Sequence, residues 1–231
     1  MLTLVIPVKF YHPALEILMT QFNCKQAQES LGPVNVVIIG DSNQSDLKKL
    51  AARFENIMLI APPAGGRGAA LAKGGARIKQ GWMLFVHADT CFQDDYMQEI
   101  AVFMKGKHDR AAYFKFKQDA RGWKAWGLER LVVLRNALFA LPYGDQGLLI
   151  HHALYKELGG FREDYPLFED VDLVQKIGRK RLHKLPVAAV TSHERYKDGY
   201  LPRILLNMKC LWLYFVARKH PRDIIDIYLK R

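Results

Sequence analysis

Cysteine is scarce in this sequence. The 231 residues include only Cys24, Cys91 and Cys210, which lie far apart and form no Cys-x-x-Cys pair. An odd number of cysteines at such spacing supports neither a disulfide framework nor a zinc site. A protein that does not depend on disulfide bonds suits a reducing compartment. We therefore expect a cytoplasmic protein.

Long apolar runs are also missing. The longest, Leu211–Ala217, follows Lys209 and precedes a basic stretch, whereas a membrane-spanning helix needs about 20 apolar residues. The first seven residues, MLTLVIP, lack the basic start and the small-residue cleavage site of a signal peptide. We expect no membrane-spanning segment, and Leu2–Val8 is predicted to be the first strand.

Acidic residues are outnumbered by basic ones. The chain has 34 Lys and Arg against 23 Asp and Glu, which gives a formal net charge of +11. This excess favours an anionic partner: nucleic acid, an anionic membrane surface and a phosphorylated substrate all qualify. A basic solvated surface with no specific partner is the alternative. No RNA-recognition or helix-turn-helix signature is present, so we expect no nucleic-acid partner.

The composition predicts one folded domain over residues 1–231. Hydrophobic residues make up 50% of the chain and charged residues 25%, and the charges are spread among apolar runs. This distribution is typical of a globular chain and argues against disorder. No Ser- or Pro-rich linker divides the sequence, and it contains no internal repeat.

Strands and helices alternate in the first 90 residues. Apolar runs predict strands at 2–8, 34–39, 57–60 and 82–86, with helices at 13–22, 46–54 and 69–80 between them. Such alternation is typical of βαβ units and a largely parallel sheet. Ser45 is expected to cap the second of these helices. We therefore predict a Rossmann-like nucleotide-binding half at residues 1–90.

The pattern is looser after Asp89. Helices are expected at about 94–104, 124–139 and around 171–177, with strands near 112–116, 147–150 and 187–190. We interpret residues 91–200 as the second half of the same domain. Residues 201–231 are helical in pattern, with large apolar side chains among Lys and Arg. Such a tail can lie on an anionic membrane, pack on the core or join a second subunit.

A carboxylate follows the fourth predicted strand. The run Leu84–Thr90 reads Leu-Phe-Val-His-Ala-Asp-Thr, which puts Asp89 at the end of the strand with His87 close by. Open α/β sheets bind ligands at this edge, and a carboxylate there suits a divalent cation held against a phosphate. An ordinary Asp turn is the alternative. His193 is a second candidate ligand, or an ordinary surface residue.

Glycines and charged side chains follow other predicted strands. Gly65–Gly68 precedes a helix, where free N–H groups and the Arg67 guanidinium suit a diphosphate, although the loop is neither a GxGxxG nor a Walker A motif. Asp41 ends the second strand, where a carboxylate can bind a nucleobase N–H or ribose hydroxyls, or form an Asx-turn. Arg195 is a candidate phosphate clamp.

Two polar segments in the second half are candidates for substrate contact. Gly144, Asp145 and Gln146 precede a buried strand, where they suit a contact with sugar hydroxyls or form a plain turn. Glu169 and Asp170 open a helix, whose dipole favours carboxylates in any case. One of these two carboxylates is a candidate general base for an attacking hydroxyl.

Taken in order, these segments resemble those of a known enzyme family. They are Gly66-Arg67, Leu84–Thr90, Gly144–Gly147, Leu167–Asp170 and Ser192–Tyr196. The chain is similar to the family 2 glycosyltransferases, which have the GT-A fold, and it looks most like a small soluble subgroup encoded near arsenosugar biosynthesis genes. The resemblance implies an α/β protein with a Rossmann-like nucleotide-binding half, a mixed-sheet acceptor half and a C-terminal helical extension.

The resemblance also implies a reaction and a site. The reaction is an inverting, metal-dependent transfer of a sugar from a UDP- or GDP-sugar to a hydroxyl acceptor, with Mn²⁺ or Mg²⁺ at the diphosphate. Asp170, with Glu169 beside it, takes the catalytic role. The remaining implied roles are donor-nucleotide contacts from Pro7, Asp41, Arg67 and Arg195, sugar or acceptor contacts from Gly144, Asp145 and Gln146, and metal contacts from Asp89, His87 and His193.

The sequence departs from the family pattern at several points. Lys9 and Phe10 follow the first strand where the family usually has Asn-Glu, His87 replaces the first Asp of the Asp-x-Asp motif, and Tyr196 replaces a Trp. One alternative is a sugar nucleotidyltransferase, but the glycines here do not follow strand one. The other is a non-catalytic binding module, which would be expected to lack both Asp89 and Asp170.

Overall fold

The computed structural model describes residues 1–93, 95–197 and 199–229. Within them, one mixed sheet of eight strands runs in the order β3-β2-β1-β4-β7-β6-β8-β5. The strands are β1 (Leu2–Val8), β2 (Val34–Gly40), β3 (Ile57–Ile60), β4 (Trp82–Phe85), β5 (Thr90–Phe92), β6 (Ala111–Gln118), β7 (Leu148–His151) and β8 (Leu182–Thr191).

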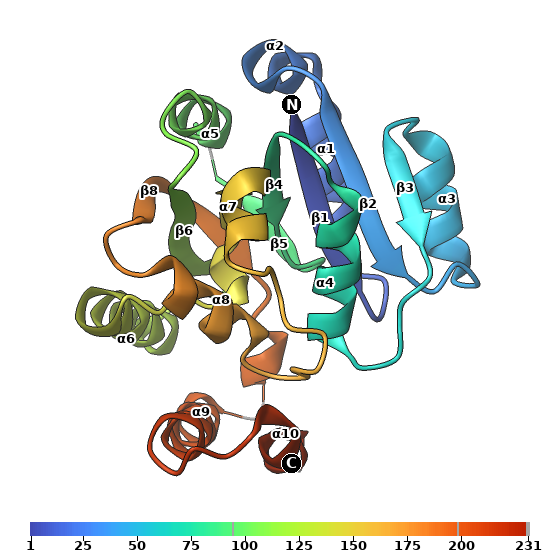
Figure 1. The fold of residues 1–231 in the computed structure, drawn as a ribbon. Helices are drawn as coiled ribbons and strands as arrows, with labels where there is room; N and C mark the ends of the chain where they lie inside the picture. The colour runs from blue at the N-terminus through green and yellow to red at the C-terminus, as the bar shows by residue number, and fades with distance from the viewer. Residues whose placement is uncertain (94, 198, 230–231) are drawn as a thin grey trace.

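Helices cover both faces of the sheet (Figure 1). They are α1 (Ala14–Asn23), α2 (Lys25–Leu31), α3 (Ser45–Arg53), α4 (Arg67–Arg77), α5 (Tyr96–Met104), α6 (Trp123–Phe139), α7 (His152–Glu157), α8 (Glu169–Ile177), α9 (Tyr200–Phe215) and α10 (Pro221–Leu229). Short 3₁₀ segments occur at η1 (Gly144–Gln146) and η2 (Glu194–Tyr196).

The predicted parallel half is confirmed. β1 lies between β2 and β4 and runs parallel to both, and β3 is parallel to β2. Leu4 and Ile6 of β1 pack in the core layer that includes α1, α3 and α5, whereas Val5 packs in the layer that includes α4, α7 and α8. Because both faces are covered, these strands are apolar almost throughout, which explains their continuous hydrophobic runs.

The second half brings a distant segment to the end of β4. β7 runs antiparallel to β4, with Leu148 opposite Phe85. The residues that lead into β7, including η1, therefore lie beside the point where the chain leaves β4 for His87 and Asp89. The sheet topology thus places two of the predicted polar segments next to each other.

The C-terminal helices gather near the carboxyl ends of the parallel strands (Figure 1). Cys210 and Leu213 of α9 and Ile224 of α10 share a core cluster with Phe168 and Val171, at the start of α8. The tail thus packs on the rest of the chain as two helices. Among the residues that the structure describes, no helix has the length and apolar character to cross a membrane.

Some local predictions differ from the structure. Ser45 is the first residue of α3 and not its cap: Gln44 holds the N-cap position, and its side chain makes no capping hydrogen bond to the helix. The helix α2 and the strand β5 are not among the predicted elements. Each has a weak local signal, because α2 buries only Ala27 and Leu31, and the three residues of β5 pair with the distant β8.

Candidate functional site

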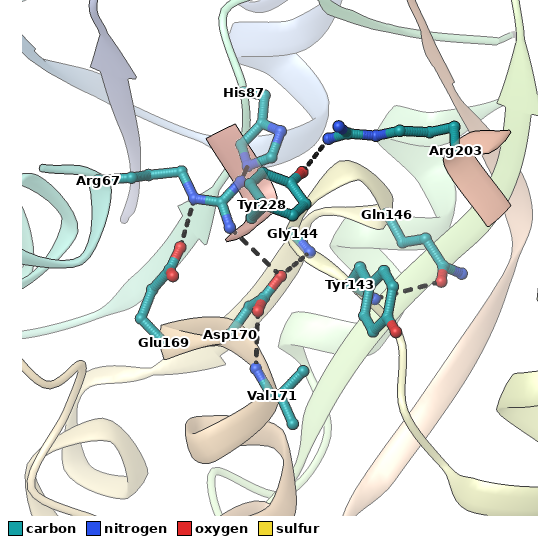
Figure 2. Close-up of polar contacts among 10 residues, drawn as sticks. All are labelled: Arg67, His87, Tyr143, Gly144, Gln146, Glu169, Asp170, Val171, Arg203 and Tyr228. Carbon is teal, nitrogen blue, oxygen red and sulfur yellow. Dashed lines mark hydrogen bonds and ion pairs between the residues drawn. The ribbon is translucent and has the colours of Figure 1, made fainter. Parts of the chain in front are cut away.

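The start of α4 brings a cation to the carboxyl edge of the sheet. Gly65 and Gly66, with φ of 114° and 85°, adopt backbone conformations that favour glycine. A side chain at Gly68 would overlap the backbone carbonyl of Tyr165, so this glycine allows α4 to approach the loop before α8. Arg67, the first residue of α4, points toward the start of α8 (Figure 2).

Arg67 connects two carboxylates and an imidazole (Figure 2). Its Nε donates a hydrogen bond to Glu169, Nη2 lies 3.8 Å from Asp170 Oδ2, and Nη1 lies 3.5 Å from His87 Nε2. The Glu169 side chain is fully buried, whereas that of Arg67 is 27% exposed. Because a buried carboxylate needs a charged partner, Glu169 fixes the guanidinium in place.

The charges of this cluster influence one another strongly. Burial opposes the charged form of Arg67, but the carboxylates of Glu169 and Asp170 outweigh it and raise the pKa of Arg67. Burial raises the pKa of Glu169, and the Arg67 guanidinium acts in the opposite direction. Arg67 is therefore a permanent cation at this edge, suited to an anionic ligand.

Asp170 is oriented by two backbone N–H groups. Its Oδ2 accepts a hydrogen bond from Gly144 N at 2.6 Å, and its Oδ1 accepts one from Val171 N at 2.8 Å (Figure 2). A Cβ at Gly144 would lie 2.8 Å from His87 Nε2 and 3.3 Å from Asp170 Oδ2. Glycine is therefore the residue that lets η1 approach both side chains.

His87 and Asp89 are the candidate metal ligands beside this cluster. Among the described residues, no three His, Cys, Asp or Glu side chains are grouped so as to hold a metal ion by themselves. Magnesium in proteins is often held by one or two carboxylates together with substrate phosphates. The carboxylate of Asp89 fits a metal bound in this way, jointly with a diphosphate. The Nε2 atom of His87, by contrast, faces Arg67.

These groups line a cavity of about 750 Å³. The predicted site residues on its wall are Arg67, His87, Asp89, Gly144, Asp145 and Asp170. They come from the start of α4, the end of β4, η1 and the start of α8. The volume lies in the range of roughly 300–1,000 Å³ that is usual for small-molecule sites.

Other predicted site residues do not line this cavity. They are Pro7, Asp41, Gln146, Glu169 and His193. Pro7 lies within β1, opposite Ile39 of β2. Asp41 forms an Asx-turn, which is the alternative to a nucleotide contact given above, because its Oδ1 accepts a hydrogen bond from Asn43 N at 2.9 Å.

His193 and Arg195 follow the end of β8, between Ser192 and Tyr196, which line the cavity. Nδ1 of His193 is 2.7 Å from Asp119 Oδ1, and the backbone N–H of His193 donates to the same oxygen. The backbone of Arg195 belongs to η2, whereas its side chain lies outside the described part of the structure.

Gln146 has a structural position behind the cavity wall. It is 1% exposed, and its Oε1 accepts hydrogen bonds from Arg135, at 2.9 Å, and Asn136, at 3.0 Å. Its Nε2 donates to the carbonyl of Phe114. The Arg135 guanidinium in turn stacks on the Tyr143 ring, 3.4 Å from the ring centroid. Gln146 thus positions Arg135 and Tyr143, which do line the cavity.

The predicted site residues do not include Arg135, Arg203 and Tyr228, which are among the polar residues of the cavity wall. Arg203 of α9 donates a hydrogen bond to the Tyr228 hydroxyl of α10 and stacks on its ring (Figure 2). Nothing local marks these two residues, because they reach the cavity only through the packing of both helices on the rest of the chain. The one available signal for Arg135 is a cation within an otherwise apolar helical stretch.

Comparison with known proteins gives a result for structure and none for sequence. No protein-family profile matches the chain, and no curated protein matches it. PcManGT, a mannosyltransferase from Pyrobaculum calidifontis solved with GDP-Man and Mn²⁺, is similar with a TM-score of 0.66 and 17% identity, over 98% of this chain and 68% of that one. "S. aureus TarS 1-349" is similar with a TM-score of 0.63 and 14% identity, over 98% and 68%. Its complex with UDP gives 0.60 and 15%, over 98% and 69%.

These similarities define the fold class. They extend over nearly the whole chain, and they confirm the GT-A fold that the sequence motifs imply. Identities of 14% and 17% are too low to carry more than the fold, because one fold hosts many activities. The function must therefore be argued from the residues of the cavity.

Proposed function

We propose that this chain is an inverting, metal-dependent glycosyltransferase that moves a sugar from a UDP- or GDP-sugar to a hydroxyl acceptor. The observation that carries the proposal is the cavity in which Arg67, Asp89 and Asp170 meet at the strand edge of a GT-A fold. A cation for the diphosphate, a carboxylate for a metal and a separate carboxylate for proton transfer are the groups that this reaction needs.

Asp170 is the proposed general base. The acceptor oxygen attacks the anomeric carbon and forms the new bond, while the bond from that carbon to the diphosphate oxygen breaks. The electron pair leaves with the nucleoside diphosphate, and the acceptor proton passes to Asp170. Attack on the face opposite the leaving group inverts the anomeric centre. The two backbone N–H donors leave lone pairs on both Asp170 oxygens for this proton.

Arg67 is the proposed partner of the diphosphate. Its guanidinium is held by the buried Glu169 and remains charged, so it is oriented before the donor binds. Such preorganised cations stabilise the charge that develops on a leaving phosphate group. Glu169 accordingly acts through Arg67 and is a positioning residue. Tyr143 and Tyr196 also line the cavity, and burial raises the pKa of each to about 12, so both remain hydroxyl donors at neutral pH.

A divalent cation, Mn²⁺ or Mg²⁺, is the proposed cofactor. Asp89 would hold it, with His87 as the proposed second ligand. When bound, such an ion neutralises charge on the leaving diphosphate as a Lewis acid. The metal contact of His193 and the donor contacts of Pro7, Asp41 and Arg195 stay predictions.

We further propose that the chain belongs to the family 2 glycosyltransferases and to the subgroup encoded near arsenosugar biosynthesis genes. The five motif segments support this assignment. We interpret the chain as one domain, with residues 1–90 for the nucleotide, 91–200 for the acceptor and 201–231 as a helical tail. The three free cysteines support a cytoplasmic location.

Donor turnover by the Asp170→Asn variant tests the proposal. Wild-type protein is screened for hydrolysis of UDP- and GDP-sugars. We expect the rate of the variant to be lower by about 10²–10⁴-fold, the usual contribution of a general base. Asp172→Asn is the matched control, because Asp172 lies on the same helix but pairs with Lys176 and does not line the cavity. Full activity in Asp170→Asn would remove this residue as the base.

The same assay tests the metal. We expect EDTA to abolish wild-type turnover and Mn²⁺ to restore it, whereas Asp89→Asn should respond weakly to Mn²⁺ at any concentration. Asp46→Asn, an exposed carboxylate paired with Lys49 on α3, is the control. Turnover that is indifferent to EDTA would contradict the metal assignment, and a wild-type protein that hydrolyses no UDP- or GDP-sugar would contradict the proposed function itself.

A further inference from the structure

The cavity continues away from Asp170 between two helices. Leu134 and Leu138 of α6 and Met208 and Trp212 of α9 line this part, which we call the α6–α9 channel. Their exposed fractions are 52%, 58%, 60% and 57%. The two helices lie at the same end of the molecule (Figure 1), and Ile204 of α9 packs against a cluster that includes α6. The channel therefore has large apolar side chains on both walls.

α6 has apolar side chains that do not pack against the sheet. Leu128 and Val132 form one stripe and pack with Phe116 of the sheet. Leu134 and Leu138 belong to a second stripe, which faces the channel instead of the core. A helix on a sheet needs one apolar stripe, and a contiguous exposed patch of this kind marks an interaction site.

The ends of the channel have different chemistry. Its inner end is the part of the cavity with Asp89 and Asp170, and Arg135 and Arg203 line the same cavity. The buried Nε of Arg135 has no hydrogen-bond partner among the described residues. The channel therefore suits a narrow ligand with an anionic, hydrogen-bonding head at the carboxylate end and an apolar tail. The net charge of +11 favours the anionic head further.

We propose that the acceptor is an anionic lipid with a hydroxyl-bearing head. Its hydrocarbon chain lies in the α6–α9 channel, its anionic group lies between Arg135 and Arg203, and its hydroxyl reaches Asp170. This proposal rests on the proposed function, because it names the molecule whose hydroxyl oxygen bonds to the anomeric carbon as its proton passes to Asp170. A second copy of the chain would cover the exposed walls but would not place a hydroxyl at the inner end.

Binding of lysophosphatidylglycerols of increasing acyl-chain length tests the proposal. These lipids combine hydroxyls, a phosphate and one chain, and they are titrated by calorimetry below their critical micelle concentrations. We expect affinity to rise by about fourfold for each added methylene until the channel is full, the factor that corresponds to burial of one such group. Glycerol phosphate, which has the head without the chain, should bind far more weakly.

Matched variants locate the binding. We expect Leu134→Gln and Met208→Gln to flatten the dependence on chain length. Val133→Gln and Leu205→Gln are the controls, because these residues lie on the same two helices with exposed fractions of 51% and 56% but do not line the cavity. The controls should bind the lipid series as the wild type does. Equal losses of lipid affinity in all four variants would overturn the assignment of the acyl chain to the α6–α9 channel.

Three other outcomes would overturn the proposal. One is equal affinity for glycerol phosphate and its longest lipid relative. Another is binding to phosphatidylglycerol vesicles with no chain-length dependence for the free lipids, which would identify a membrane surface. The third is a dimer in ultracentrifugation that Leu134→Gln dissociates. Donor hydrolysis by wild-type protein without lipid separates the two hypotheses. Lipid binding without any donor turnover refutes the proposed function, and the acceptor role with it, but leaves a lipid site in the channel. Turnover without lipid binding refutes only this inference.

Discussion

Gly144 shows how closely the polar groups of the cavity are packed. Its backbone N–H donates to Asp170 Oδ2 at 2.6 Å, and the absence of a side chain leaves room for the His87 ring. The same carboxylate oxygen lies 3.8 Å from Arg67 Nη2. One backbone position thus holds the proposed base and leaves room for the imidazole, and its residue type follows from geometry.

We expect Gly144→Ala to damage the site more than the fold. The new Cβ would lie 2.8 Å from His87 Nε2, so the ring must move, at a stability cost of about 1–3 kcal/mol. Donor hydrolysis should fall by roughly 10–100-fold, because small misplacements of reacting groups have effects of this size. Thermal unfolding and the donor assay measure the two effects separately.

Gly127→Ala is the control for this substitution. Gly127 lies within α6, and a Cβ there would have no neighbour within 4 Å. An alanine should stabilise the helix by roughly 0.4–1 kcal/mol and leave donor hydrolysis unchanged. If Gly144→Ala matched this control in stability and activity, the close packing of η1 against His87 would be wrong.

At the scale of elements, α10 carries part of the site although it lies far along the chain. Ile224 is fully buried in the cluster formed by α8, α9 and α10, and Tyr228, one turn further on, lines the cavity. The Tyr228 hydroxyl accepts a hydrogen bond from Arg203 of α9. The packing of α10 therefore sets where Arg203 meets the cavity.

We expect Ile224→Ala to loosen α10 and weaken acceptor binding. Loss of the buried side chain should lower the free energy of unfolding by about 2–3 kcal/mol, at the lower end for such a change because the helix is peripheral. The KM for the lipid acceptor should rise, while kcat changes less, since Arg203, which we place at the acceptor's anionic group, loses its fixed partner but Asp170 does not. Chemical denaturation and steady-state kinetics measure both.

The neighbouring Ile225 provides the comparison. It is only partly buried, so Ile225→Ala should cost less stability and leave KM unchanged. An Ile224→Ala protein that is destabilised but has the wild-type KM for the acceptor would show that α10 supports the fold without shaping the acceptor site.

The elements show why some of the site was predictable and some was not. Asp89 follows a buried strand, and Asp170 opens an amphipathic helix, so each carries a local pattern that the sequence exposes. Arg203 and Tyr228 meet only after α9 and α10 pack on α8, and the spacing of apolar residues along the sequence does not indicate that contact. Gln146 belongs to a segment whose other predicted residues line the cavity, but its own burial behind Arg135 depends on the sheet as a whole.

At the scale of the whole molecule, three tyrosines are shielded from water, one in the core and two on the cavity wall. Tyr155 packs under α4, close to Gly75 and Gly160, and its hydroxyl accepts a hydrogen bond from Phe161 N at 3.1 Å. Tyr143 and Tyr196 line the cavity. Burial raises the pKa of all three, from 10.0 to about 12. These phenols therefore make the stability of the molecule depend on alkaline pH.

We expect the protein to lose stability as the pH rises through the interval from 10 to 12. A pKa raised in the folded state means that the folded chain holds the proton more tightly than the unfolded chain does. The resulting stabilisation is fully present below pH 10 and is lost as the pH rises through 12, with roughly 2–3 kcal/mol for each such tyrosine. Phenolate absorbance and circular dichroism, followed across this interval, should change together. Tyr155→Phe should shrink the loss by one tyrosine's share. If the absorbance difference between wild type and Tyr155→Phe showed the Tyr155 phenolate forming near pH 10 with native circular dichroism, this hydroxyl would be accessible to solvent in the folded protein.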